Sequence, residues 1–277
     1  MSFTQELSTQ QIQRYAPSAF AEQPYHAQSS RYAFIPTISI IDGMRQAGFL
    51  PVMASQSRTR IADKQGFTKH MIRFRSANSL QAGASAIVGD SILEAVLINS
   101  HDGTSAYKLM CGVFRFVCSN GMVVADSLLE SINIRHTGNV VDEVIAGSNR
   151  ILANAPRVMD TIRNWKTLEL APIEQKLLAE TAHTLRFPDD ENDGAAPIKN
   201  STSVTPEMLL SPRRYDDRGN DLWRTFNRIQ ENSLKGVKTY SNHRRVSSRA
   251  VKSIDGDVKL NRALWSLAEK MAELKRA

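Results

Sequence analysis

The chain has 277 residues, a hydrophobic content of 42% and a formal net charge of +7 at pH 7. This length suits one large domain or two smaller ones, and the apolar content predicts a globular protein with a core. No run approaches the roughly 18 apolar residues of a membrane span, and the first residues lack a signal-peptide pattern. The charge favours an anionic partner, with nucleic acid as the first candidate and a membrane surface as the second. Of these two we expect nucleic acid, and no membrane partner.

Cysteine and histidine usage argues against a metal or cofactor site. Cys111 and Cys118 lie seven residues apart on one predicted strand, which directs them to opposite faces, so they neither pair nor share a metal. The six histidines show no metal-binding spacing, and no glycine-rich nucleotide motif is present. We expect no zinc, no other metal, no cofactor and a reducing, cytoplasmic location.

The first 35 residues are polar, with scattered aromatic side chains. We expect an N-terminal arm that packs loosely on the next domain and holds one short helix. Aromatic residues beside Arg14 and Arg31 can stack on bases, or they can serve as ordinary packing anchors.

A helix is predicted from Thr37 to Gly48, followed by a β-hairpin with strands at 49–60 and 67–75 and a turn at 63–66. From Arg58 to Arg75 there are six basic residues and one acidic residue. If the strand register aligns them, one face of the hairpin is a basic comb suited to phosphates, and the alternative is an ordinary solvated face. The comb residues are Arg58, Arg60, Lys64, Lys69, Arg73 and Arg75.

Within the stretch 106–124, the run between an Asp-Gly and an Asn-Gly turn predicts a central strand, because it is apolar on both faces. A neighbouring strand is predicted at 91–99. Arg115 is the anomaly, since a guanidinium in a central strand needs a partner or a polar surface. Two alternatives stay open: a buried ion pair, with Glu94 as the candidate carboxylate, or an arginine that faces a ligand.

Helices follow at 140–165, with a weakness at Pro156, and at 172–185. In the second of these, Ile173, Leu177 and either His183 or Leu185 mark the apolar side. The polar stretch 186–203 predicts an exposed linker. The fold class is therefore α+β, an antiparallel sheet with helices on one face, and the predicted divisions are an arm at 1–35, a core domain at 36–185, a linker at 186–203 and a helical C-terminal region at 204–277.

The C-terminal region holds helices at 221–233, capped by Asp221, and at 258–275. A second basic cluster between them contains no acid from Lys235 to Lys252, and its lack of pattern indicates a mobile loop. Its candidate nucleic-acid contacts are Lys238, Arg244, Arg245 and Arg249.

The chain resembles the domain-of-unknown-function 932 family of phage- and plasmid-like proteins. The resemblance lies in PTISIIDGMRQAGFLPVMASQSRTR (36–60), KHMIRFR (69–75), GVFRFVCSNGMVV (112–124) and the tail from YSNHRRVSSRAVK onward. It implies a bacterial cytoplasm and a prophage or plasmid context. The order of elements is also similar to the core of the single-strand annealing recombinases, by topology alone, and topology does not fix function.

The sequence leaves three hypotheses of function. The first is a non-enzymatic, oligomeric protein that binds single-stranded DNA through the basic comb, Arg115 and the second cluster, and that anneals strands in recombination. The second is an accessory protein whose basic face binds and regulates an acidic host protein. The third, a metal-dependent nuclease, is disfavoured because the acids near the sheet lack a nuclease spacing, so we expect no catalytic residues.

Overall fold

A computed structural model describes residues 5–28, 32, 34–81, 91–115, 120–123, 131–134, 139–188, 204–241 and 244–276. Its contacts divide the chain into two compact units, residues 1–157 and residues 158–277. This division precedes the predicted linker at 186–203, and the part of that linker from 189 to 203 lies outside the described residues. The predicted α+β class, with an antiparallel sheet and a helical C-terminal part, is confirmed.

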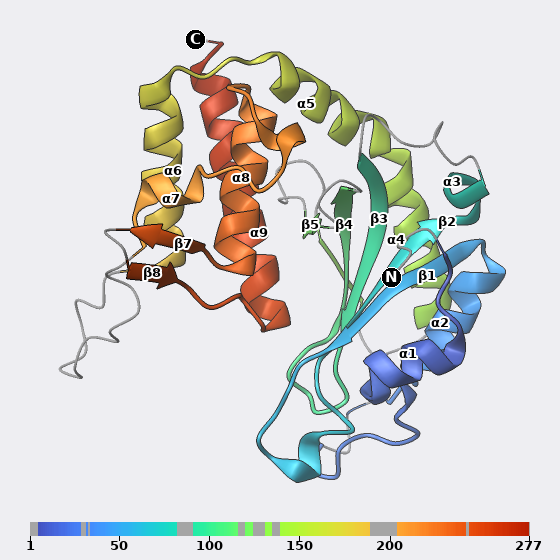
Figure 1. Ribbon diagram of the computed structural model, residues 1–277. Helices are drawn as coiled ribbons and strands as arrows, with labels where there is room; N and C mark the ends of the chain where they lie inside the picture. Colours follow the sequence, from blue (N-terminus) through green and yellow to red (C-terminus); the bar gives the residue numbers. More distant parts are fainter. Residues whose placement is uncertain are drawn as a thin grey trace. The chain divides into compact units, whose positions relative to one another are not determined.

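The first unit contains an antiparallel sheet and several helices (Figure 1). Its strands are β1 (Phe49–Gln56), β2 (His70–Ser76), β3 (Ser91–Asn99), β4 (Tyr107–Arg115), β5 (Asn120–Val123) and β6 (Ile132–Ile134). Its helices are α1 (Thr9–Tyr15), η1 (Pro17–Phe20), α2 (Thr37–Gln46), η2 (Ala62–Lys64), α3 (Ala77–Gln81) and α4 (Val140–Ala153).

The strands run in the order β1-β2-β3-β4-β5, and β6 also pairs with β4. The predicted hairpin of β1 and β2 is confirmed, although β1 ends at Gln56 rather than Arg60. The strand predicted between the Asp-Gly and Asn-Gly turn signals is present as β4, but it ends at Arg115, and Asn120 and Gly121 begin β5 instead of forming the turn. The chain turns back before them, so that Gly112 of β4 lies opposite Val123 of β5. The turn itself, residues 116–119, lies outside the described part of the chain.

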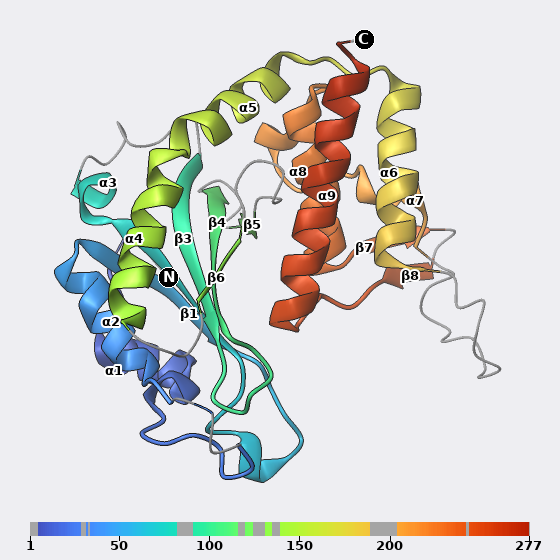
Figure 2. The same cartoon turned by 180° about the vertical axis from the view of Figure 1, so that it is seen from behind.

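Helices α2 and α4 cover one face of this sheet, as both views show (Figures 1 and 2). The two helices touch where Gly43 of α2 meets the side chain of Val141, which leaves no room for a Cβ atom. At Gly147 of α4, an added Cβ would lie 2.7 Å from Leu109 of β4. The face that carries Leu109 is therefore the helix-covered face, and side chains at alternate positions point to the other one.

A buried polar network fixes the start of α2 to the sheet. The hydroxyl of Thr37 lies 2.9 Å from His70 Nε2 and accepts from Asn99 at 3.1 Å. His70 Nδ1 lies 3.2 Å from the carbonyl of Thr68, which can only accept a hydrogen bond. Burial lowers the pKa of His70 to about 4, so the ring is neutral at pH 7.

The N-terminal segment is tied to the sheet at defined points rather than loosely packed. The amide of Leu7 donates to the carbonyl of Pro51 at 2.7 Å. Ser18 Oγ lies 2.9 Å from His70 Nδ1, and Ile12, on the inner side of α1, is fully buried. The one predicted helix of the arm is present as α1, with Ser8 as its cap.

The second unit is helical with a short β-hairpin. Its elements are α5 (Ala155–Thr167, which begins just before the division), α6 (Pro172–Arg186), α7 (Pro206–Leu209), η4 (Tyr215–Asp217), α8 (Leu222–Lys235), β7 (Lys238–Ser241), β8 (Arg244–Ser247) and α9 (Ile254–Leu274). The break predicted at Pro156 occurs two residues earlier, at Asn154 between α4 and α5, and Pro156 lies in the first turn of α5. Helices α6, α8 and α9 lie side by side (Figure 1), around the aromatic rings of Trp165, Trp223, Phe226 and Trp265.

Helix α6 has the predicted bounds but not the predicted inner face. Ile173 and Leu177 are 72% and 51% exposed, and Leu185 is also exposed. Leu178 and Gln175 are buried instead. Gln175 points inward because its amide donates to the carbonyl of Leu170 at 3.0 Å and accepts from Arg228 at 3.0 Å.

Candidate nucleic-acid interface

The loop between β1 and β2, residues 57–69, presents the exposed part of the predicted basic comb. Arg58 and Arg60 are exposed there, and Lys64 and Lys69 are half-buried. These four residues lie after the end of β1 and before the start of β2. The structure thus brings four of the predicted contact residues into one loop, hereafter the basic loop.

The acidic residue of the basic loop does not neutralise its arginines. Asp63 accepts from the hydroxyl of Tyr25 at 3.1 Å and lies 3.7 Å from His26 Nδ1. Among the residues that the structure describes, no carboxylate pairs with Arg58 or Arg60. Their charge is therefore available to an external anion.

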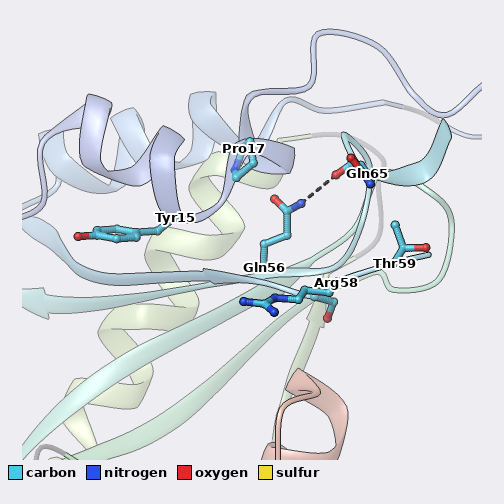
Figure 3. A pocket seen from close by; sticks show the side chains of 7 residues that line it. Tyr15, Pro17, Gln56, Arg58, Thr59 and Gln65 are labelled. Carbon is cyan, nitrogen blue, oxygen red and sulfur yellow. Dashed lines mark hydrogen bonds between the residues drawn. The ribbon is translucent and has the colours of Figure 1, made fainter. Parts of the chain in front are cut away.

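A polar pocket of about 410 Å³ opens beside the basic loop (Figure 3). It lies between the N-terminal segment and the end of β1, with Tyr15 at one end and Thr59 and Gln65 at the other. The side chain of Arg58 runs from the Thr59 end toward Tyr15. Pro17, Gln56 and Ser57 complete the lining.

Gln56 holds the walls of this pocket together. Its carbonyl oxygen accepts from the backbone amide of Ser18 at 2.8 Å, and its Nε2 donates to the carbonyl of Gln65 at 2.8 Å. The ladder continues one step past β1, because the amide of Ser57 donates to the carbonyl of Lys69 at 2.7 Å. These bonds join the N-terminal segment, the strand end and the basic loop, so the pocket exists before any ligand binds.

Arg73 and Arg75 do not belong to an exposed comb. They are 8% and 1% exposed and form ion pairs with Glu94, which is fully buried. Arg75 Nε donates to Glu94 Oε1 at 2.7 Å, and Arg73 Nε contacts Oε2. Burial lowers the pKa of Arg75, and the charge of Glu94 opposes that shift.

The register explains why these arginines are buried. Arg73 lies opposite Val96 of β3, and Glu94 lies two residues further along the same face. Phe114 of β4 shares this face, with the guanidinium carbon of Arg75 4.5 Å from its ring centroid. The sequence did contain a signal, since Glu94 is the one acid in the run SILEAVLIN, but Glu94 was considered only as a candidate partner of Arg115.

Arg115 is buried, at 3% exposure, on the helix-covered face that also carries Leu109. Glu94 opposes Gly112 and points to the other face, so it is not the partner of Arg115. Arg115 therefore contributes no exposed charge to the basic loop.

The second basic cluster belongs to the second unit and is more ordered than predicted. It includes the β7–β8 hairpin, in which Lys238 pairs with Ser247. Lys238 and Arg249 are exposed. Arg186 donates to the backbone carbonyl of Arg249 at 2.8 Å, which anchors the segment after the hairpin. The side chains of Arg244 and Arg245 lie outside the described residues.

The residues that the structure describes contain neither a candidate metal centre nor a candidate membrane-spanning helix. No group of three or more His, Cys, Asp or Glu side chains there is arranged to hold a metal ion. No helix in the same residues is both long and apolar enough to cross a membrane.

The fold and the loop define the class: a two-unit α+β protein that presents a basic loop and a polar pocket on its first unit. The chain belongs to the family described as "Domain of unknown function (DUF932)", whose model matches residues 24–265. This confirms the resemblance predicted from the sequence.

Two relatives come from Escherichia coli strain K12. They are "UPF0380 protein YfjQ" and "UPF0380 protein YafZ", each 42% identical over 265 residues, which cover 95% of this chain and 90% of the relative. No solved structure matches the chain.

Proposed function

We propose that the protein binds single-stranded nucleic acid, with single-stranded DNA as the preferred form, through the basic loop of its first unit. The observation that carries this proposal is the exposure of Arg58 and Arg60 without a described carboxylate partner. Guanidinium groups in that state bind phosphate oxygens and release counterions, which gives affinity without sequence preference.

The proposal includes a homo-oligomer in the cytoplasm of a bacterium that carries a prophage or plasmid. Strand annealing would be its recombination activity, because several protomers along one strand can leave bases free to pair. Light scattering with and without an oligonucleotide tests the assembly. A protein that stays monomeric in both conditions contradicts the annealing part of the proposal and leaves strand binding standing.

Fluorescence anisotropy with a labelled single strand and its duplex, across a salt series, tests the binding itself. We expect tighter binding to the single strand and a linear fall of log affinity with log salt. Replacing both Arg58 and Arg60 by Ala should reduce the slope by about 1.4, since each neutralised phosphate of a single strand contributes about 0.7.

Arg150→Ala is the matched control for each of the single changes Arg58→Ala and Arg60→Ala, because Arg150 is exposed on α4, outside the basic loop, and its loss also removes one positive charge. It should leave the slope unchanged. If the wild-type protein binds neither single strand nor duplex at low salt, the proposal fails, and an acidic protein partner becomes the ligand to seek.

A further inference from the structure

We propose that the pocket beside the basic loop holds one nucleotide of the bound strand, with the base against Tyr15 and its phosphate at Arg58. This inference rests on the proposed function and deepens it, because it adds the binding of a base in the pocket to the binding of phosphates by the basic loop.

The charge of the pocket lining suits a phosphate. Among its lining residues Arg58 is the one full charge, and no carboxylate lines the pocket. Arg58 is exposed, and its side chain runs along the pocket rather than away from it (Figure 3). A guanidinium in that position offers a phosphate paired donors in a planar fork.

The uncharged lining suits a base and a sugar. Tyr15 provides an aromatic ring, and base–aromatic stacking tolerates any base because every base has a π face. Thr59 Oγ1 accepts from the amide of Ile61 at 3.1 Å, which leaves its hydroxyl proton to donate. Gln65 accepts the hydrogen bond from Gln56 through its backbone carbonyl, so its side-chain amide remains for the ligand.

The size and rigidity of the pocket limit it to one nucleotide. A volume of about 410 Å³ lies near the lower end of the roughly 300–1,000 Å³ range of small-molecule sites. The Gln56 bonds to the N-terminal segment and to the basic loop fix the walls. The rest of the strand would then follow the loop past Arg60, which lies two residues beyond Arg58.

The first test needs no variant. Wild-type protein is titrated with a labelled oligothymidylate and with an abasic strand of the same length and charge. We expect the abasic strand to bind about tenfold more weakly at the same salt, within the roughly 5- to 150-fold range that loss of a stacked base gives. The two strands should share one salt slope, because their phosphates are the same. Equal affinity for the two strands overturns the pocket inference.

Variants then locate the effect. Tyr15→Ala should weaken binding of oligothymidylate about tenfold with an unchanged salt slope, and it should leave binding of the abasic strand as it was. Tyr15→Phe keeps the ring and should stay within about twofold of wild type. Circular dichroism of each variant checks that α1 is intact.

Arg60→Ala separates the two proposals. If Arg60→Ala weakens strand binding and reduces the salt slope, while Tyr15→Ala has no effect, the proposed function stands and the pocket inference is wrong. If neither strand binds the wild-type protein, both fail together. If the protein instead binds an oligoglutamate of similar charge, and Tyr15→Ala does not change that binding, the ligand is an acidic peptide and the pocket inference is wrong.

Discussion

The buried ion cluster on the sheet face without α2 and α4 allows a direct test of the strand register. Replacing Glu94 by Gln keeps the length of the side chain and removes the carboxylate that both Arg73 and Arg75 contact. Both arginines are nearly inaccessible to solvent, at 8% and 1% exposure, so water cannot replace the lost charge while the sheet stays closed. We expect a large loss of stability.

The expected free-energy loss is about 3–5 kcal/mol, the cost of removing one partner of a buried ion pair. Arg75 should dominate, because burial already lowers its pKa and the charge of Glu94 opposes that effect. In a unit of about 157 residues, 1 kcal/mol corresponds to about 2–4 °C in Tm. The Tm of the first unit should therefore fall by about 6–20 °C.

Urea unfolding followed by far-UV circular dichroism measures the loss, and hydrogen exchange of β2 and β3 assigns it to the first unit. Tryptophan fluorescence is unsuited to that purpose, because Trp165, Trp223 and Trp265 all belong to the second unit. Glu143→Gln, at an exposed position of α4, is the control and should cost less than about 1 kcal/mol. A loss below about 1 kcal/mol for Glu94→Gln would refute the buried cluster and restore Arg73 and Arg75 as candidate phosphate contacts.

Three further outcomes are expected from the structure. Leu178→Ala should lower the free energy of unfolding by about 2–5 kcal/mol because Leu178 is buried, whereas Leu177→Ala should change it by no more than about 0.5 kcal/mol. Urea unfolding of the two variants measures both losses, and a larger loss for Leu177→Ala would show that the inner face of α6 is wrong. The folded pKa of His70, about 4, lies below its ordinary 6.5, so the unfolded state takes up the proton first and stability should fall by up to roughly 3 kcal/mol from pH 6.5 to pH 4. Unfolding free energies of wild type and His70→Gln across that range check this, since the variant should lose that slope. Asp221→Ala should lower the free energy of unfolding by about 1 kcal/mol or more, because it removes the cap on the Arg224 amide. Asp221→Asn should retain most of the stability that the cap provides, and equal thermal midpoints for the two variants would count against the cap.

Local chemistry was sufficient to predict most elements of the chain. The run SILEAVLIN predicted β3 at its observed bounds, because an apolar, β-branched segment between turns has few other stable conformations. Asp221 was identified as a helix cap, and its carboxylate does accept from the Arg224 amide at 2.9 Å. Each of these signals depends on residues within a few positions of one another.

The basic comb could not be predicted correctly, because its exposure depends on a strand far along the chain. Arg73 and Arg75 alternate with apolar residues, which is the pattern of a strand with one solvated face. The register between β2 and β3 places Glu94 on the same face as these arginines, and that face is buried. Apolar pattern alone cannot distinguish a solvated charge from one whose partner comes from another strand.

The inner face of helix α6 was predicted wrongly because a polar side chain, Gln175, takes a buried position. Ile173 and Leu177 follow a helical apolar stripe, yet Gln175 takes the inner position because Leu170 and Arg228 offer it hydrogen bonds there. A buried amide with three described bonds, the third to Asn220 at 3.3 Å, is well satisfied. The choice of face depended on the tertiary partners and could not be read from the helix.

The buried cluster also bounds what the first unit can do electrostatically. Six basic residues lie between positions 58 and 75, but two of them are held by Glu94, so the basic loop can contribute at most four charges to the binding of a strand. At about 0.7 per phosphate, the salt slope of the loop alone cannot exceed about 2.8. A measured slope well above this value requires further contacts, and the exposed Lys238 and Arg249 of the second unit are the first to replace. If Lys238→Ala and Arg249→Ala together bring a steep slope down to about 2.8, both units bind the strand. If the slope stays steep, Arg244 and Arg245 of the second basic cluster are the next residues to replace.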